Sequence, residues 1–315
     1  MLFIKFEHEK DLIVFNTPIL FLIFNRPDTT KQVFESIRKV RPNKLYLAAD
    51  GPRASKLGEV DLCMQTRDIV SQIDWDCEVK TLFRDENLGC KIAVSSAIDW
   101  FFENEEQGII LEDDCLPDES FYGFCETLLN YYKFNERVMH ISGDNFQNGM
   151  IRGNGSYYFS NYNHIWGWAT WRRAWKNYRV DLDFLTENEI QNLIDKQFDT
   201  NKERLFWKKI FNKVIGSTIG TWDYQWTYAI WKQNGLSILP NKNLVANIGF
   251  SANGTHTSGN DILGLGNLET FSIPNIIHPT EIEINKKADK FGLDRYFNPS
   301  KFFYLYKKII HHIKN

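Results

Sequence analysis

The first half of the chain alternates short apolar runs with segments whose apolar residues recur at helical spacing. The run from Pro18 to Phe24 (PILFLIF) is typical of a strand covered on both faces, and Asn25-Arg26-Pro27 ends it. Thr29 with Gln32 resembles a capping box and predicts a helix start. Further strands are expected at 44–49, 78–83, 108–111 and 138–142, with helices at 59–73, around 92–101 and after Pro117. This alternation predicts an α/β fold with a doubly wound, mainly parallel sheet.

The second half of the chain differs in composition, because eight of the ten tryptophans lie between Trp166 and Trp231. Residues 181–216 are expected to form a helical insert, with Thr186 and Glu189 as a second capping box. The segment GTWDYQWTYAIW, which begins at Gly220, predicts a helix start, and Gly235 its stop. The small polar residues of 249–260 (GFSANGTHTSGN) are typical of a lid loop.

Polar clusters follow successive predicted strands. They are Asn25-Arg26, Asp50, Glu112-Asp113-Asp114 and Asp144-Asn145. The carboxyl ends of parallel strands meet at one edge of a sheet, and ligands bind at that edge. The acidic triplet therefore lies where a ligand site is expected.

Three consecutive acids at the end of a buried strand suit a hard divalent cation. Mg²⁺ or Mn²⁺ takes oxygen ligands, commonly one or two carboxylates together with substrate phosphates. The alternative is that Asp113 or Asp114 caps the following helix while Glu112 stays in solvent. Asp50-Gly51 has a similar alternative as a simple turn, and Arg26 is either a surface residue or a donor to a diphosphate.

Asp223 also allows two interpretations. A carboxylate in the first turn of a helix is favoured by the helix dipole, and the surrounding tryptophans would then be core. In the functional interpretation, Asp223 is a general base held among aromatic rings, and sugar faces stack nearby.

Composition narrows the class of protein. The chain has 315 residues, a formal charge of −3 and 43% hydrophobic residues, which predicts a folded protein without a broad nucleic-acid surface. Its five cysteines form no CxxC pair, so we expect a reduced protein without a thiolate zinc site. The N-terminal sequence shows no secretory signal, and no apolar run approaches the roughly 20 residues of a membrane span. These features predict a cytoplasmic location.

A series of motifs resembles the GT-A-fold glycosyltransferases, in particular the N-acetylglucosaminyltransferase that initiates complex N-glycan branching and its bacterial relatives. The match runs in order from about Thr17 to about Gly259. It comprises IFNRPD, AADGP, NLGCKIAVSSAIDWFF, IILEDDCLPDESFYGF, HISGDN, HIWGWATWRRAW, TWDYQW and SANGTHTSG. The EDD triplet, the GW-x₂-W-x₃-W segment and the WD-x₂-W helix start are together highly specific in that order.

The resemblance implies a role for each matching residue. Arg26 and Asp50 would contact the nucleotide, with Asp50 on the uracil edge. Ser95 stands where the animal enzyme has a uracil-contacting histidine, and Lys91 is a further donor-site candidate. Glu112 and Asp113 would border ribose and sugar, Asp114 would bind the metal, and Asp223 would be the catalytic base. The 249–259 loop would close over the diphosphate through Ser251 or His256, and Trp168, Trp171 and Trp222 are acceptor-side candidates.

These roles predict an inverting, metal-dependent glycosyltransferase that uses a nucleoside-diphosphate sugar, such as UDP-GlcNAc, and a glycan acceptor in surface polysaccharide synthesis. A sugar-1-phosphate nucleotidylyltransferase is the alternative enzyme, but FNRPDTTKQ lacks the glycines that its first loop needs. A non-catalytic carbohydrate-binding protein is the alternative from another class, although both the EDD and WD positions are filled. The catalytic domain is predicted at 16–275, with a donor half at 16–150 and an acceptor half at 151–275.

The C-terminal extension, 276–315, ends in the segment KFFYLYKKIIHHIKN from Lys301. Its apolar residues cluster on one side of a helix, while lysines and histidines supply the remainder and no acid interrupts them. Such a helix lies in the interface of an anionic membrane or packs its apolar side on the domain. We expect peripheral attachment to the inner face of the cytoplasmic membrane.

Overall fold

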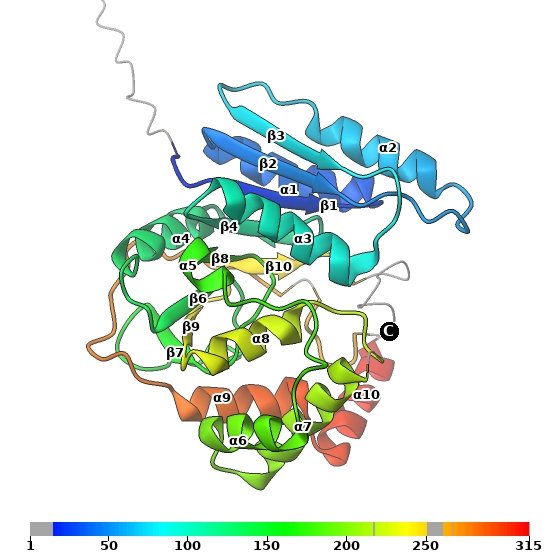
Figure 1. Cartoon of the computed structure of the whole chain (residues 1–315). Helices are drawn as coiled ribbons and strands as arrows, with labels where there is room; N and C mark the ends of the chain where they lie inside the picture. Colours follow the sequence, from blue (N-terminus) through cyan, green and yellow to red (C-terminus); the bar gives the residue numbers. More distant parts are fainter. Residues whose placement is uncertain (1–14, 217, 251–260, 267, 315) are drawn as a thin grey trace, which may run out of the picture.

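An eight-stranded sheet forms the centre of the molecule (Figure 1). The computed structural model describes residues 15–216, 218–250, 261–266 and 268–314. The strand order is β3-β2-β1-β4-β8-β6-β9-β7, and only β8 and β7 run against the other six strands. The strands of this sheet are β1 (Ile19–Ile23), β2 (Lys44–Ala49), β3 (Glu78–Phe83), β4 (Gln107–Glu112), β6 (Val138–Ser142), β7 (Tyr157–Ser160), β8 (Trp168–Trp171) and β9 (Leu236–Pro240).

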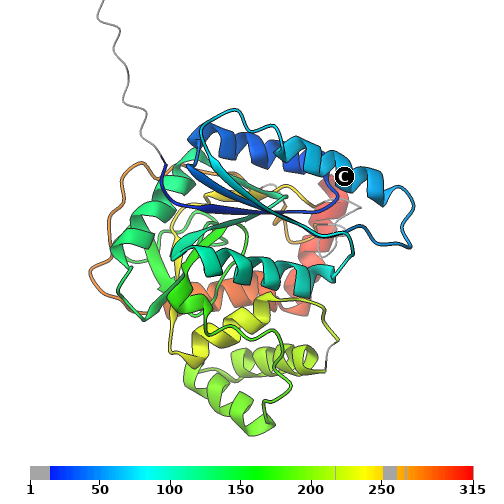
Figure 2. The same ribbon diagram turned by 45° about the horizontal axis from the view of Figure 1, so that its top comes forward.

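Helices cover both faces of the sheet, which confirms the doubly wound α/β prediction. Figure 2 shows α1 (Pro27–Val40) and α2 (Glu59–Val70) on one side of β1, β2 and β3, and α3 (Gly89–Asn104) on the other. One hydrophobic core lies under α1 and α4 (Glu119–Tyr131), and a second lies under α3 and α8 (Asp223–Lys232). Alternate residues of each central strand face one core or the other, so these strands are apolar throughout.

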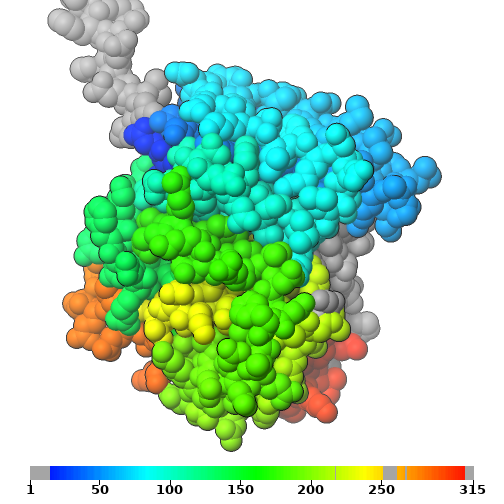
Figure 3. Space-filling view, in the orientation of Figure 1, coloured from blue at the N-terminus to red at the C-terminus, as the bar shows by residue number. Residues whose placement is uncertain are grey.

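The second half of the chain completes the same sheet rather than forming a separate one. β8 lies between β4 and β6 and is antiparallel to both, while β9 extends the sheet beyond β6. The predicted donor and acceptor halves therefore share one sheet, and the space-filling view shows them in direct contact (Figure 3). A small second sheet pairs β5 (Cys115–Pro117) with β10 (Val245–Asn247) directly after the acidic triplet.

The predicted insert at 181–216 is helical. It contains α6 (Glu187–Gln197) and α7 (Asn201–Ile215), both of which pack on α8, and the short α5 (Arg172–Trp175) precedes it. The capping box of Thr186 and Glu189 is present at the start of α6. The one predicted at Thr29 is wrong, because α1 already begins at Pro27 and Thr29 donates to the Arg26 carbonyl from inside the first turn.

The C-terminal extension packs against the far end of the sheet through α9 (Lys286–Gly292) and the π-helical turn η1 (Leu293–Phe297). The buried Asp289 carboxylate accepts hydrogen bonds from Ser160 Oγ and, at 3.0 Å, from Asn161 N. α10 (Lys301–Lys314) follows at the edge of the molecule. Among the residues that the structure describes, none of the helices combines the length and apolar character needed to cross a membrane.

Candidate functional site

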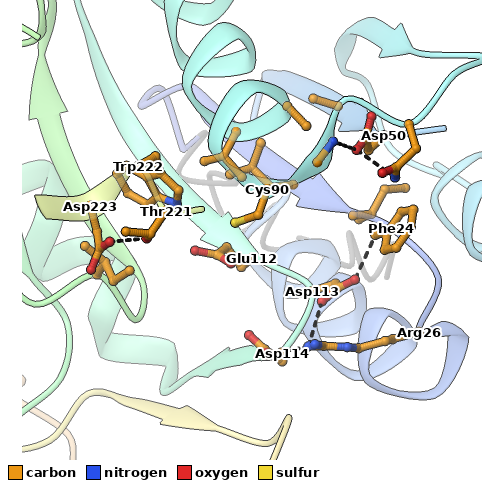
Figure 4. Close-up of a pocket in the computed structure, with 18 of the residues that line it drawn as sticks. Phe24, Arg26, Asp50, Cys90, Glu112, Asp113, Asp114, Thr221, Trp222 and Asp223 are labelled. Carbon is orange, nitrogen blue, oxygen red and sulfur yellow. Dashed lines mark hydrogen bonds and ion pairs between the residues drawn. The ribbon is translucent and has the colours of Figure 1, made fainter. Parts of the chain in front are cut away.

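A cavity of about 540 Å³ opens at the carboxyl ends of β1, β2 and β4. Its other walls are the first turns of α3 and α8 and the residues Ile165 and Trp166 that precede β8. The volume is typical of a pocket for a small organic ligand or cofactor. Arg26, Asp50, Glu112, Asp113, Asp114 and Asp223 all line it, as Figure 4 shows. The predicted clusters after β1, β2 and β4 therefore meet at one cavity, whereas the fourth predicted cluster, Asp144-Asn145 after β6, does not line it.

The acidic triplet begins with the last residue of the central strand β4. Asp113 accepts a hydrogen bond from the Phe24 backbone N–H at 3.1 Å, which ties the triplet to the end of β1. Arg26 forms ion pairs with Asp114, at 2.5 Å, and with Asp113, at 3.5 Å. Both aspartates are buried, so their charges are held close together in a site of restricted water access. One guanidinium thus faces three carboxyl groups.

The electrostatics of the triplet follow from this imbalance. Burial, with the charges of Asp114 and Asp113 beside it, raises the pKa of Glu112 to about 8. Burial and Asp114 likewise raise the pKa of Asp113 to about 7. Burial alone would lower the pKa of Arg26, but the neighbouring carboxylates reverse this and raise it. The carboxyl groups therefore resist being charged together beside one guanidinium, and a further cation in the site would relieve their repulsion.

This donor set fits a divalent cation that shares its oxygen ligands with a substrate. Within the described ranges, no three His, Cys, Asp or Glu side chains gather closely enough to enclose an ion on their own. Mg²⁺ and Mn²⁺ sites commonly take one or two carboxylates and complete the shell with phosphate oxygens and water. Asp114 lines the cavity and is already paired with the positive charge of Arg26. Its carboxylate is therefore the one that fits the role of metal ligand.

Asp223 approaches the cavity from the opposite side, as the first residue of α8. Thr221 Oγ1 donates a hydrogen bond to its carboxylate, and Figure 4 shows Glu112 and Asp223 directed into the same space. Aromatic packing fixes the start of the helix: the Trp222 ring stacks on Trp168 at 5.6 Å. The carboxylate is therefore held in place across the cavity from the acids.

A buried histidine of β6, His140, holds α8 in place through a hydrogen bond. Trp226 Nε1 donates to His140 Nδ1 at 3.1 Å, and the other ring nitrogen of His140 lies 2.8 Å from the His164 carbonyl oxygen. Burial lowers the pKa of His140 to about 3, so the ring stays neutral and can accept the indole hydrogen bond. α8 thus reaches the cavity from a rigid support.

Asp50 lines the cavity, but its oxygens are occupied by the protein. They accept hydrogen bonds from the backbone N–H groups of Gly51 (3.0 Å), Leu88 (2.9 Å) and Gly89 (3.0 Å), and from Asn87 Nδ2 (2.9 Å). These bonds fix the loop between β3 and α3 against the end of β2. Asp50 therefore shapes the wall of the cavity, and its predicted contact with a nucleobase lacks a free acceptor position.

Two other donor-site candidates lie outside the cavity. Lys91 extends toward the insert and forms an ion pair with Asp181 at 2.6 Å. Ser95 is buried and donates its hydroxyl to the Lys91 carbonyl at 2.7 Å. Neither side chain lines the cavity. Ser251 and His256 lie outside the described residues.

Two of the three tryptophan candidates require correction. Trp168 and Trp171 are fully buried on opposite faces of β8, one in each hydrophobic core. An acceptor cannot reach either ring, because strand packing covers both. Trp222 does line the cavity beside Asp223.

The structure adds Phe24, Arg53, Arg84 and Cys90 to the cavity wall. Arg84 directly follows β3, so the strand-end argument applied to the first two strands and to β4 would have found it. Phe24 and Arg53 lie one residue beyond the end of β1 and in the loop after β2. Cys90 has a pKa raised to about 12 by burial, which keeps it a thiol rather than a nucleophile.

Comparison with known proteins leaves the family open. Neither the family models nor the curated proteins gave a match to this chain. Among solved structures, HddC from Yersinia pseudotuberculosis is similar at 12% identity, with a TM-score of 0.32, over 54% of this chain and 85% of that one. A UDP-glucose pyrophosphorylase complexed with UDP-glucose is similar at 10% identity and a TM-score of 0.32, over 51% and 78% of the two chains.

A third similar structure is 4-diphosphocytidyl-2C-methyl-D-erythritol synthase from Anaerococcus prevotii, at 7% identity and a TM-score of 0.33. The match covers 62% of this chain and 99% of the synthase chain. Likenesses at this level carry no argument about activity. The functional argument rests instead on the residues of the cavity.

Proposed function

We propose that this chain is an inverting, metal-dependent glycosyltransferase that uses a nucleoside-diphosphate sugar, in particular a UDP sugar such as UDP-GlcNAc. The observation that carries the proposal is the position of Asp223 across one cavity from Glu112, Asp113 and Asp114. A base on one side and a diphosphate-binding group on the other are what an in-line displacement at a sugar carbon requires.

The proposed donor lies along the ends of the strands. Its diphosphate contacts Arg26, whose forked guanidinium suits phosphate oxygens, and its sugar lies near Glu112. Asp114 would hold Mn²⁺ or Mg²⁺, which when bound supplies positive charge to the leaving diphosphate. The site thereby separates the leaving-group end from the base.

Asp223 then acts on the acceptor. Its carboxylate takes the proton of an acceptor hydroxyl, whose oxygen forms a bond to the anomeric carbon as the bond to the diphosphate oxygen breaks on the opposite face. The configuration at that carbon inverts. The acceptor in this proposal is a glycan, and holding both substrates in one cavity contributes by orientation.

A nucleotidylyltransferase is a weaker alternative for this cavity. That reaction binds the triphosphate in a glycine-rich loop after the first strand, where backbone N–H groups surround the phosphates. Here the connection from β1 to α1 is only Phe24-Asn25-Arg26, and it contains no glycine. The nucleotidylyltransferase reaction would also leave Asp223, at the opposite wall of the cavity, without a role.

The test compares variants on a panel of nucleotide sugars with Mn²⁺. Asp223→Asn should lower turnover by about 100-fold or more while donor affinity stays unchanged, because only the base is lost. Asp114→Asn should abolish Mn²⁺-dependent binding of UDP with the fold intact. The exposed Asp183→Asn in the insert is the matched control.

Two results would contradict the proposal. One is near-normal turnover in Asp223→Asn. The other is production of pyrophosphate from UTP and a sugar 1-phosphate by the wild-type protein, which would identify the nucleotidylyltransferase reaction instead.

We further propose that α10 attaches the enzyme to the inner face of the cytoplasmic membrane. Phe302, Leu305 and Tyr306 are 83%, 57% and 52% exposed, so this part of the helix does not pack its apolar side on the domain. Lys301, Lys307 and Lys308 lie on the same helix, and no acid is present in it. Apolar side chains flanked by lysines suit anionic lipid.

Vesicle co-sedimentation tests this attachment. The full chain should bind vesicles that contain phosphatidylglycerol at low salt, and high salt should weaken the binding. Phe302→Ser with Leu305→Ser should abolish it without changing the melting temperature, since both side chains are exposed. Absence of binding by the wild type, or a clear loss of thermal stability in the double variant, would show that the helix serves the fold.

A further inference from the structure

The end of the cavity near β2 and β3 has no assigned ligand contact, because the carboxylate of Asp50 is occupied by the protein itself. The carboxylate of Asp50 accepts four hydrogen bonds from the protein itself. A carboxylate oxygen has two lone-pair positions, so these bonds use the whole capacity of the side chain. Some other group must therefore recognise whatever lies at this end.

Arg84 is placed to do so. It directly follows β3, and its backbone N–H donates to the Ala49 carbonyl at 3.0 Å, which continues the pairing of β2 and β3. Arg67 Nη2 donates both to the Arg84 carbonyl, at 2.6 Å, and to the Asp50 carbonyl, at 3.2 Å. The backbones of residues 50 and 84 are thus held side by side at the cavity wall.

The guanidinium of Arg84 has unused hydrogen-bonding capacity. Arg84 lines the cavity, and within the described part of the chain its guanidinium donates one hydrogen bond, from Nη2 to Ser96 Oγ at 2.8 Å. An arginine carries five N–H donors and no acceptor. Arg84 takes part in no ion pair among the described residues. Burial in the cavity wall lowers the pKa of Arg84, and the charge of Asp50 only partly opposes that lowering. A neutral carbonyl oxygen is the acceptor that suits these donors without a charged partner.

The order of the strands indicates which part of a donor meets Arg84. Along the sheet the sequence is β3 with Arg84, β2 with Asp50, β1 with Arg26, and β4 with the acids. Figure 4 shows Phe24 between Asp50 and Asp113, so the aromatic ring separates this end from the triplet. With the diphosphate at Arg26, the base extends toward β3, and the edge remote from the ribose reaches Arg84.

We propose that Arg84 recognises the carbonyl at C4 of the nucleobase and makes this enzyme selective for uracil over cytosine, an inference that rests on the proposed nucleotide-sugar site. Uracil carries a carbonyl oxygen at that position and can accept from the guanidinium. Cytosine carries an amino group there, and two sets of donors would face each other with no acceptor between them. A mismatch of this kind in a partly buried site leaves polar groups unpaired.

The experiment measures UDP, CDP and inorganic pyrophosphate binding by calorimetry, with Mn²⁺ present. The wild type should bind UDP about 10-fold or more tightly than CDP, the usual scale for reading one base edge. Arg84→Met keeps the aliphatic stem but removes the donors. It should weaken UDP binding, bring the UDP to CDP ratio to within about 2-fold, and leave pyrophosphate binding unchanged. Arg38→Met is the control, because Arg38 of α1 pairs with Glu35 of the same helix and with Asp74 after α2, and does not line the cavity.

The outcomes separate this inference from the function on which it rests. Equal binding of UDP and CDP by the wild type, or an unchanged ratio in Arg84→Met, overturns the role of Arg84 while the transferase proposal stands. If Arg84→Met weakens pyrophosphate as much as UDP, Arg84 contacts phosphate and base recognition is wrong. If the wild type binds no nucleotide at all, the proposed function fails first and this inference fails with it.

Discussion

The contact between Gly249 and Asp114 allows a sharp test of the site. Ile248 N donates to the Asp114 carbonyl at 2.8 Å, so the segment after β10 is held directly against the last acid of the triplet. A Cβ atom added at Gly249 would overlap Asp114 Oδ2 and would lie 2.7 Å from its Cβ and 2.8 Å from its Cγ. Rotation of the side chain can relieve the contacts to Oδ2 and Cγ, but not the contact to Cβ, because Cβ does not move with the side-chain torsions.

Gly249→Ala must therefore displace the Asp114 side chain or the backbone of one of the two segments. Insertion of a methyl group into a packed site costs about 1–3 kcal/mol, and we expect a loss of this size in the free energy of unfolding measured with urea. Displacing Asp114 from Arg26 should also weaken Mn²⁺-dependent UDP binding by about 10-fold or more, since a metal ligand depends on its position.

Gly220→Ala is the matched control, because nothing lies within 4 Å of a Cβ at that position. It should change the free energy of unfolding by less than about 1 kcal/mol and leave UDP binding unaltered. If Gly249→Ala equals the wild type in both assays, the close packing of Gly249 on Asp114 does not support the site.

Two further predictions concern groups that support the cavity. Asp50→Asn places an amide N–H₂ against the backbone donors of Leu88 and Gly89. The free energy of unfolding measured with urea should fall by about 1–3 kcal/mol. An unchanged midpoint would show that the hydrogen bonds of Asp50 do not hold this loop. Burial lowers the pKa of His140 to about 3 from 6.5, so the stability that the neutral ring provides is complete above pH 6.5 and is lost as the pH falls toward 3. That loss is at most about 1.4 kcal/mol per pH unit. Between pH 7.5 and 5, wild type should lose more stability than His140→Gln, and parallel losses would contradict the argument.

The strand-end argument predicted much of the site from the sequence. Arg26 and the acidic triplet lie in one cavity because parallel strands bring their carboxyl ends together, and Asp223 joins them from the start of α8, which was visible in the TWDYQW segment. The helical insert and the capping box at Thr186 were also predictable, since local pattern determines both. The short apolar runs of β1, β2, β4 and β6 were recognisable for the same reason.

Other features depend on contacts that local pattern does not contain. β8 is only four residues long, is covered on both faces and contains two tryptophans, so its segment WATW was interpreted as surface chemistry rather than as a strand. Asp50 was interpreted as a ligand contact because its four donors come mainly from a loop 37 to 39 residues away in the chain. The C-terminal helix allowed two interpretations from sequence, because a basic amphipathic pattern suits both; the exposure of Phe302 and Leu305 favours the membrane interpretation, which stays a proposal.

The position of β8 has a consequence for how the chain folds during its synthesis. β4 and β6 are complete by residue 142, but the strand that joins them in the sheet spans residues 168–171, and β9, the other partner of β6, spans 236–240. Until those residues leave the ribosome, β4 has one unpaired edge and β6 has two. Such edges are templates for aggregation. A fragment ending near residue 150 should therefore recruit chaperones rather than fold, and fusion or split-protein designs should not cut the chain between its two halves.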